Sequence, residues 1–328
     1  MTHLRNITVF AMAAIATAAT CMLARTPAVA APPTARSFGL EFATSDDFAM
    51  YPKLRVSRAL TKSERGKRLE MTEYLPPIAN QGETSSCVGW STAYYCFTYS
   101  IGKIRGFTKD ELNNPKYMFS PNYIWDQYNR GKPENGMHIF QAMDVLAKQG
   151  CCSLNEMPWD ETGQAQPTQT AMTRAALFKA RQTVSLFVGP PNDPMDPEKL
   201  KTVLWETKMP VVLGIMVYDD LGGIPNDPNF VYSPGPGAKP QGGHAVCIVG
   251  YDDDKHAFRM VNSWGSDWGD NGFVWLAEDF LAKCAREGWT QTPGGPRSRA
   301  VDGKPETLLH YKELYIEPAE KSKAVANP

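Results

Sequence analysis

The sequence lacks several features that would assign it at once to a simple class. Neither charge predominates, since 34 Lys and Arg stand against 35 Asp and Glu, which argues against electrostatic binding to nucleic acid. There is no C-x-x-C pair, no Cys/His cluster at zinc spacing and no glycine-rich phosphate loop, so we expect no metal and no cofactor. After the first thirty residues no apolar run approaches the roughly 18 residues of a membrane-spanning helix.

The composition that remains is that of a folded globular protein. Of the 328 residues, 42% are hydrophobic and 11% aromatic, which excludes a chain that is disordered throughout. The length suits one large domain or two lobes of ordinary size.

Residues 1–30 have the pattern of a secretory signal peptide. Residues 7–23 are nearly all apolar, and Ala28 to Ala30 supply the small residues of an A-x-A cleavage site. We expect cleavage before Ala31 and an exported protein, periplasmic or secreted, with no stable membrane insertion afterwards. Six cysteines remain once Cys21 is removed. If one is kept reduced for chemistry, at most two disulfides can form, and their pairing stays open.

The mature chain divides into segments of different character. Residues 31–62 begin Pro/Ala-rich and show no sustained period, so we expect a loosely held N-terminal segment, at most a short pro-segment. Residues 63–318 form the main domain, with a helical lobe over about 84–195 and a β lobe over about 196–318. Residues 319–328 are expected to form a flexible tail.

Local patterns place the main elements. Apolar periodicity and capping residues predict helices over 86–101, 120–129 and 137–149, and Asp196-Pro197 opens a short helix. Short β-type runs are found at 211–218, 244–251, 258–264, 272–276 and 313–317. The fold class is therefore α+β. We interpret Asp252 to Asp254 as an exposed turn.

Cys87 opens the first of these helices. A helix N-terminus favours a thiolate, because unpaired backbone N–H groups and the helix dipole stabilise negative charge. A lone cysteine at such a place is nevertheless more often a small buried hydrophobe. His244 alone would suggest a core histidine, and Asn262 a turn residue.

Three segments together point to chemistry. Residues 81–91 contain Gln81, Gly82 and, after four more residues, Cys87 followed by aromatic and small residues. Residues 243–251 (GHAVCIVGY) and residues 262–273, which include Asn262-Ser263-Trp264-Gly265, follow later in the chain. These segments resemble the cysteine, histidine and asparagine signatures of the papain-like cysteine peptidases, the papain/cathepsin family, as in a divergent bacterial-type member. The resemblance spans roughly residues 75–317.

The resemblance implies a two-lobe fold, with a helical lobe, an antiparallel β-barrel-like lobe and a cleft between them. It implies that Cys87 is the nucleophile, that His244 takes its proton and that Asn262 orients the imidazole. Trp264 would shield that hydrogen bond from water. Gln81 and the Cys87 backbone N–H would form the oxyanion hole.

The match is incomplete in several places. Thr84 replaces the family's disulfide cysteine, and Val88 replaces the Trp that usually follows the nucleophile. The glycine-rich segment that pairs with the substrate matches only weakly at Asn135-Gly136-Met137. Through that match, the expected substrate-binding residues are Gly136, Met137, Gly243 and Ala245, around an apolar pocket. The segment before the domain is too short to build a globular inhibitor, so we expect it to dock weakly.

The function that the sequence favours is an exported cysteine endopeptidase, a monomer whose partner is a peptide or protein substrate. A thiol amidase or transferase acting on a non-peptide or cell-wall amide remains an alternative that the sequence does not separate from it. The third alternative, a peptide-binding protein without turnover, is disfavoured because Gln81, Cys87, His244 and Asn262 are all intact.

Overall fold

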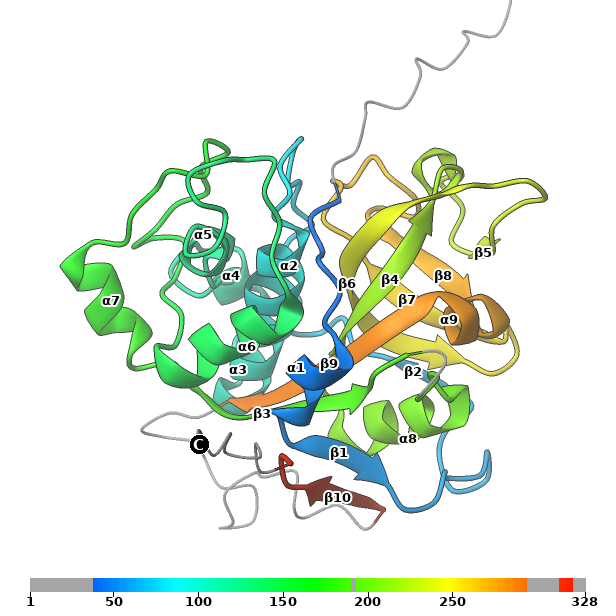
Figure 1. The fold of residues 1–328 in the computed structure, drawn as a ribbon. Helices are drawn as coiled ribbons and strands as arrows, with labels where there is room; N and C mark the ends of the chain where they lie inside the picture. Colours follow the sequence, from blue (N-terminus) through cyan, green and yellow to red (C-terminus); the bar gives the residue numbers. More distant parts are fainter. Residues whose placement is uncertain (1–37, 190–192, 294–312, 321–328) are drawn as a thin grey trace, which may run out of the picture. The chain divides into compact units, whose positions relative to one another are not determined.

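The computed structural model describes residues 38–189, 193–293 and 313–320, all within one compact unit, Pro33–Pro328 (Figure 1). The predicted signal peptide lies outside the described residues, and so does most of the predicted tail. Among the residues that the structure describes, no helix is both long enough and apolar enough to cross a membrane.

Helices dominate the first half of the described chain, and most of them gather on one side in Figure 1. These helices are α1 (Ser45–Ala49), α2 (Cys87–Gly89), η1 (Trp90–Phe97), α3 (Thr98–Arg105), α4 (Lys109–Leu112), α5 (Pro121–Trp125), α6 (Ile139–Lys148) and α7 (Gln169–Ala175). The second half contributes α8 (Pro197–Thr207), the short 3₁₀ turn η2 (Leu221–Gly223) and α9 (Glu278–Cys284).

The helix predicted over 86–101 is present as one continuous run of three segments. It begins with α2 at Cys87, passes through the π-helix η1 and ends with α3 at Arg105, where Gly106 adopts a left-handed φ of 67°. All eight residues of η1 are buried, as the absence of a polar face in the sequence predicts. The run therefore forms the centre of the helical half.

The helix predicted over 120–129 is shorter than expected. Ser120 caps α5 by accepting a hydrogen bond from the Tyr123 N–H, but the helix ends at Trp125. The amide groups of Asn122 and Asn129 both donate to the Asp126 carboxylate, and Arg130 adopts a φ of 56°. These side-chain hydrogen bonds favour a turn over a further helical turn.

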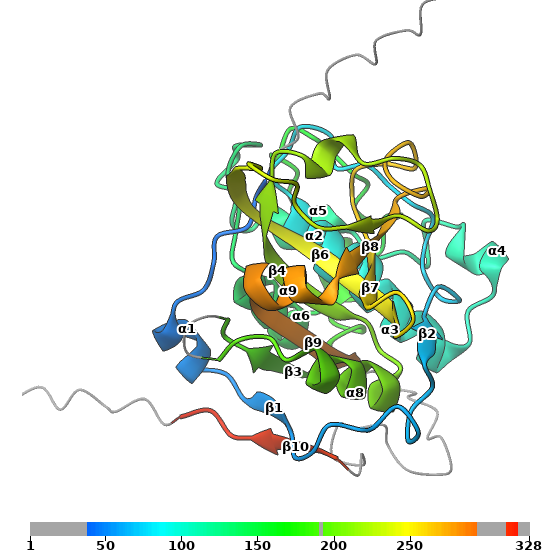
Figure 2. The ribbon, with the colours of Figure 1, turned by 90° about the vertical axis from the view of Figure 1, so that its right-hand side faces the viewer.

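One sheet collects the strands. They are β1 (Lys53–Val56), β2 (Arg68–Glu70), β3 (Ala180–Phe187), β4 (Val211–Tyr218), β5 (Val231–Tyr232), β6 (Pro240–Asp252), β7 (Ala257–Val261), β8 (Phe273–Ala277), β9 (Ala285–Pro293) and β10 (Leu314–Glu317). Their order is β10-β1-β3-β9-β4-β6-β7-β8-β5, with β2 on β6. Figure 2, turned by 90° from Figure 1, shows the twist of the sheet with β4, β6, β7 and β9 in view.

The sheet differs from the antiparallel, barrel-like lobe expected from the sequence. It is mixed, because β1 pairs with β3 and β5 with β8 in parallel. Nor does it close, since β10 and β5 are the two ends of the pairing order in the described chain. β3 also belongs to this sheet through its pairing with β9, although the expected lobe boundary near residue 195 assigned it to the helices.

The segment before the main domain is more ordered than the sequence suggested. Phe48 of α1 stacks on Trp289 of β9 with ring centroids 5.2 Å apart, and β1 lies between β3 and β10. These contacts join residues far apart in the chain, so no hydrophobic periodicity within the segment predicts them. From α1 onward the segment is part of the folded core.

The acidic turn at 252–254 is mostly buried, in contrast to the exposed turn that we expected, and only Asp254 is exposed. Asp253 is 2% exposed, and its carboxylate oxygens lie 2.8 Å from an Arg65 guanidinium nitrogen and 2.9 Å from Lys201 Nζ. The carboxylates of Glu198 and Glu278 complete this buried ion cluster through Arg65 and Lys201. The cluster ties α8 to the end of β6.

Candidate active site

Cys87 is the first residue of α2 and is fully buried. The backbone N–H of Ala245, on β6, points at its sulfur with an N to Sγ distance of 3.5 Å. The start of the central helix thus meets the strand that carries His244. The structure brings together two predicted site residues that are more than 150 positions apart.

His244 and Asn262 form a direct hydrogen bond. Nε2 of His244 lies 2.9 Å from Oδ1 of Asn262, and because an amide oxygen can only accept, the proton is on Nε2. The backbone N–H of Ser263 also donates to this oxygen at 2.8 Å. Asn262 therefore holds the ring so that its other nitrogen, Nδ1, is directed away from it.

Aromatic side chains enclose this pair. The Trp264 ring stacks on the His244 imidazole with centroids 4.8 Å apart and planes at 28°. Trp268 packs edge-on against Trp264. On the helix side, the Tyr95 hydroxyl donates to the Asn262 carbonyl at 3.0 Å. The hydrogen bond between imidazole and amide is thereby kept away from water.

Gln81 is fixed at both ends of its side chain. Its Oε1 accepts from the Ser263 hydroxyl at 2.6 Å, and its Nε2 donates to the Thr84 carbonyl at 2.6 Å. Its backbone N–H donates to the Ser263 carbonyl at 2.8 Å. Ser263, the residue after Asn262, thus links Gln81 to the loop that carries Asn262. Thr84, at the position of the family's disulfide cysteine, orients the Gln81 amide through its backbone carbonyl, and its hydroxyl donates to the Gln81 carbonyl.

Residues 38–43, which we call the N-terminal strap, lie between the two halves of the site. The Leu40 N–H donates to the Gly243 carbonyl at 3.1 Å. On the other side, the Met137 N–H donates to the Gly39 carbonyl at 2.9 Å, and the Glu41 N–H donates to the Met137 carbonyl at 3.2 Å. Two of the predicted substrate-binding residues, Met137 and Gly243, are therefore hydrogen-bonded to the strap.

Close backbone contacts explain why several of these positions are glycine. A Cβ atom added to Gly39 would lie 1.8 Å from the Ser85 carbonyl oxygen, and one on Gly136 would lie 2.0 Å from the Gly39 oxygen. A Cβ on Gly243 would lie 2.4 Å from the Leu40 oxygen. The strap thus packs so closely against the site that a Cβ atom at any of these three glycines would overlap a backbone oxygen. This close packing contradicts the weak docking expected from the sequence.

Glu287 is a site residue that the sequence analysis missed. It lies on β9, opposite Gly214 of β4, and is fully buried. A Cβ atom on Gly214 would meet both Glu287 Cγ, at 2.6 Å, and Leu40 Cδ2, at 2.7 Å. The pocket that holds Leu40 is therefore bordered by a glutamate as well as by apolar groups. The run around Glu287 has no period or motif that would have marked it.

The environment of Cys87 affects the ionisation of its thiol. Burial raises the pKa of the Cys87 thiol to about 11, although backbone N–H groups, including those of Ala245 and Gly39, partly oppose this effect. Burial in this closed arrangement therefore favours the neutral thiol over the thiolate, whereas the strap's own Gly39 N–H favours the thiolate. All six cysteines of the described residues are free thiols.

The site continues beyond the strap. A cavity of about 410 Å³ adjoins Glu41, Gly136 and Met137 and is bordered by polar side chains such as Gln127 and Arg130. No group of three or more His, Cys, Asp or Glu side chains suited to a metal ion occurs in the described part of the chain.

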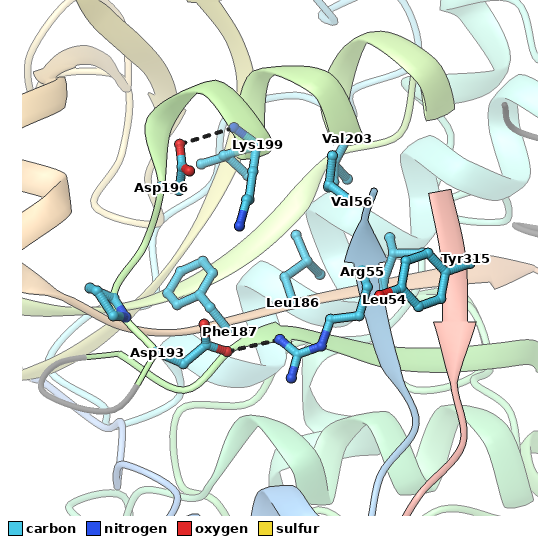
Figure 3. A pocket seen from close by; sticks show the side chains of 12 residues that line it. Leu54, Arg55, Val56, Leu186, Phe187, Asp193, Asp196, Lys199, Val203 and Tyr315 are labelled. Carbon is cyan, nitrogen blue, oxygen red and sulfur yellow. Dashed lines mark hydrogen bonds and ion pairs between the residues drawn. The ribbon is translucent and has the colours of Figure 1, made fainter. Parts of the chain in front are cut away.

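A second cavity, of about 190 Å³, lies between α8 and strands β1 and β3 (Figure 3). Apolar side chains such as Leu186 and Phe187 line it, and the Arg55 guanidinium bonds to Asp193 at its edge, with 3.0 Å between nitrogen and oxygen. It is built from elements other than those that hold Cys87, His244 and Asn262, so it is not part of the candidate active site.

Comparison with known proteins identifies relatives of this chain. The family model described as papain family cysteine protease matches residues 66–292. The chain is 25% identical over 212 residues to an uncharacterized peptidase C1-like protein of Acanthamoeba polyphaga mimivirus, covering 62% of this chain and 65% of that protein. It is 27% identical over 237 residues to the cathepsin B-like CP3 of Giardia intestinalis, covering 69% and 73%.

The chain spans less than two thirds of the length of several curated relatives that it matches, including the mimivirus protein. Among solved structures, xylellain, a cysteine protease from Xylella fastidiosa, aligns with a TM-score of 0.63 at 20% identity, over 80% of this chain and 99% of that one. That likeness shows the fold. With the family model matching well over half of the sequence, the chain belongs to the papain family of cysteine proteases.

Proposed function

We propose that this protein is an exported cysteine endopeptidase that hydrolyses peptide bonds through a thioacyl-enzyme on Cys87. The observation that carries the proposal is the arrangement of β6 and the asparagine loop. His244 Nε2 lies 2.9 Å from Asn262 Oδ1 while the neighbouring Ala245 N–H contacts the Cys87 sulfur at 3.5 Å. A cysteine, a histidine and an orienting amide in that order are the parts of an activated thiol nucleophile.

The chemistry follows from these positions. His244 accepts the Cys87 proton on Nδ1, because Nε2 is committed to Asn262, and the thiolate then attacks the substrate carbonyl carbon. The imidazolium returns the proton to the leaving amine, and a water molecule hydrolyses the thioester. Gln81 Nε2 and the Cys87 backbone N–H stabilise the negative oxygen of the tetrahedral intermediate. Trp264 shields the imidazole–amide pair.

The same proposal assigns the substrate-binding residues. Met137 and Gly243 offer the backbone groups that now bond to the strap, and an extended peptide presents the same N–H and carbonyl groups. Gly136 allows the close approach of a peptide backbone, and Ala245 lies next to the sulfur. The substrate is therefore a peptide or protein segment in extended form.

The strap must leave for a substrate to enter. We therefore propose that residues 31–62 contain an inhibitory part, the strap, and a structural part, from α1 onward. The signal peptide, the export and the monomeric state belong to the same proposal. Sequencing the N-terminus of secreted material tests cleavage before Ala31, and light scattering after gel filtration tests the monomer.

One experiment separates the proposed peptidase from its alternatives. The full chain is treated with a peptidyl epoxide probe, the labelled residue is identified by mass spectrometry, and a peptide library is then screened for cleavage. Labelling at Cys87 with cleavage of internal peptide bonds supports the endopeptidase. Labelling without cleavage of any peptide supports the amidase or transferase on a non-peptide amide. Peptide binding without labelling supports the non-catalytic binding protein.

A further inference from the structure

Two of the free cysteines lie on the elements that carry the candidate nucleophile and the candidate base. Cys96 belongs to η1, in the helical run that begins at Cys87, and Cys247 lies on β6, three positions after His244. Both thiols are fully buried, and η1 packs directly against β6. The helix and the strand therefore each bring a thiol into the core between them.

The two thiols meet in that core. The Cys247 thiol forms a side-chain hydrogen bond with Cys96. The Cys96 thiol also donates to the Pro210 carbonyl, with 3.5 Å between sulfur and oxygen. Pro210 directly precedes β4, on which Val212 pairs with Cys247. Two separate contacts thus direct the Cys96 sulfur toward the part of β6 that carries Cys247.

Neighbouring residues hold the helix over this part of the sheet. Tyr95, next to Cys96, donates its hydroxyl to the Asn262 carbonyl at 3.0 Å. Asn262 directly follows Val261, and Val261 of β7 pairs with Cys247 of β6. The backbone at Cys96 and the backbone at Cys247 are therefore held close to each other from two sides, through β4 and through β7.

The other cysteines have different neighbours. The Cys87 sulfur faces the Ala245 N–H. Cys151 and Cys152 are adjacent, and consecutive Cα atoms lie about 3.8 Å apart, closer than the roughly 4.4 Å at which ordinary disulfides begin. Cys284 is the last residue of α9 and forms no hydrogen bond with another cysteine in the described part of the chain. The contact between η1 and β6 is thus the one suited to a cross-link among the six described cysteines.

We propose that Cys96 and Cys247 are a disulfide-forming pair, which an oxidising compartment joins into a cross-link between the helix of Cys87 and the strand of His244. The inference rests on the proposed function for the export alone, because an exported chain meets such a compartment. Both thiols are reduced in the structure. The two sulfur atoms have only to close from a hydrogen bond to a covalent bond.

The bond forms by thiol–disulfide exchange with an external oxidant that itself carries a disulfide, such as oxidised glutathione or a disulfide oxidase. One cysteine thiolate attacks the oxidant's disulfide and releases its first thiol. The second cysteine then attacks the mixed disulfide and releases the second thiol. Cys96 and Cys247 together lose two protons and two electrons, and the oxidant gains both as its two thiols.

Burial determines when this exchange can occur. It raises the pKa of the Cys247 thiol well above its ordinary value, so the folded chain holds little thiolate there, and the sulfur is out of reach of solvent. We therefore expect the bond to form while the chain folds, before the helix closes on β6. Once the bond has formed, the same burial protects it from reductants.

The cross-link would act on stability and on the alignment of the site. It closes a loop of about 150 residues, which removes many conformations from the unfolded chain. It also joins the helix of Cys87 to the strand of His244 at a point that makes no contact with the strap. The two halves of the site would therefore stay joined after the strap has left.

The test folds the full chain in a buffer of oxidised and reduced glutathione. After an acid quench, the remaining free thiols are blocked with N-ethylmaleimide in denaturant, and the unreduced peptides are mapped by mass spectrometry. We expect the peptides of Cys96 and Cys247 to be linked and the other four cysteines of the described chain to be alkylated. Alkylation of both Cys96 and Cys247, or a bond from either to a different cysteine, overturns the proposal.

Stability gives a second readout. The urea midpoint of the oxidised wild type should exceed that of the reduced wild type by on the order of 1 M. This difference should vanish in Cys96→Ala and in Cys247→Ala. It should persist in Cys284→Ala, the matched control, which removes a buried thiol without a sulfur partner. A difference that persists in Cys247→Ala overturns the proposal, and if the variants do not fold, the wild-type peptide map decides.

Neither measurement requires peptidase activity. If the epoxide probe fails to label Cys87, the proposed function fails, while the cross-link is still decided by the peptide map. Protein isolated from its own cells separates the export from the pair. A bond in the glutathione-folded chain together with two reduced thiols in the isolated protein would overturn the export and support the pairing of Cys96 with Cys247.

Discussion

The Leu40 backbone N–H donates to the carbonyl of Gly243, the residue directly before His244, across 3.1 Å. The strand that carries the candidate base is therefore the strand to which the strap is bonded. The sulfur of Cys87 lies against the next residue of that strand, Ala245. The position of the strap and access to the active site are therefore coupled.

Replacing Cys87 by Ser, or His244 by Ala, should abolish turnover. The acyl intermediate requires a thiolate, and the thiolate requires the imidazole as proton acceptor. Cleavage of a peptide identified in the library screen gives the rate, and circular dichroism confirms that each variant is folded. More than a few per cent of wild-type activity in either variant would contradict the mechanism.

Replacing Gln81 by Ala should lower kcat by about ten- to a thousandfold with little change in KM, because the amide donor acts mainly on the transition state. Steady-state kinetics on one peptide separates the two constants. The loss of the Ser263 and Thr84 contacts could also loosen the loop, so thermal unfolding is followed in parallel. An unchanged kcat would remove Gln81 from the site.

Replacing Gly39 by Ala should increase the labelling of Cys87 at neutral pH by about tenfold or more, because a Cβ there would overlap the Ser85 carbonyl and prevent close docking of the strap. Gly223→Ala is the matched control, since no atom lies within 4 Å of the added Cβ. Equal labelling of the two variants would show that the strap does not restrict access to Cys87.

Replacing Asp253 by Ala should destabilise the protein by about 3–5 kcal/mol, because Arg65 and Lys201 would be left buried with fewer partners. Glu70→Gln is the control. It breaks a bond to Arg68, an exposed side chain, and should cost less than about 1 kcal/mol. Urea unfolding measures both changes.

The ion pairs of Asp253 should also make the stability of the protein depend on pH. Burial alone would raise the pKa of Asp253, but the hydrogen bonds from Arg65 and Lys201 outweigh it and lower the pKa below its ordinary value. The stabilisation is therefore present above that ordinary pKa and is lost as pH falls. The difference between wild type and Asp253→Ala should shrink on acidification, and a constant difference would contradict this.

The candidate site was predictable where single residues carry recognisable chemistry in a fixed order. Gln81, Cys87, His244 and Asn262 come together in the structure because the central helix packs against β6 and the loop after β7. The helix start at Pro121 was also readable, because a capping serine followed by proline acts locally.

The strap and Glu287 were not predictable, because contacts that leave no pattern in the sequence determine their roles. The strap is held by backbone hydrogen bonds and by glycines that allow close approach, and neither leaves a periodic pattern in the sequence. Glu287 becomes significant only because β9 places it opposite Gly214 and beneath Leu40. The open, mixed sheet likewise depends on pairings such as β1 with β3, which link distant parts of the chain.

The position of β1 has a consequence for how the polypeptide matures during synthesis. Lys53 to Val56 pair with Leu314 to Glu317, and the Arg55 guanidinium contacts the Glu317 carboxylate across 262 positions of sequence. β1 therefore cannot complete its pairing on this side until residues 314–317 have left the ribosome. Contacts of such long range close slowly, so this edge of β1 should stay open to chaperones until residues 314–317 have been synthesised.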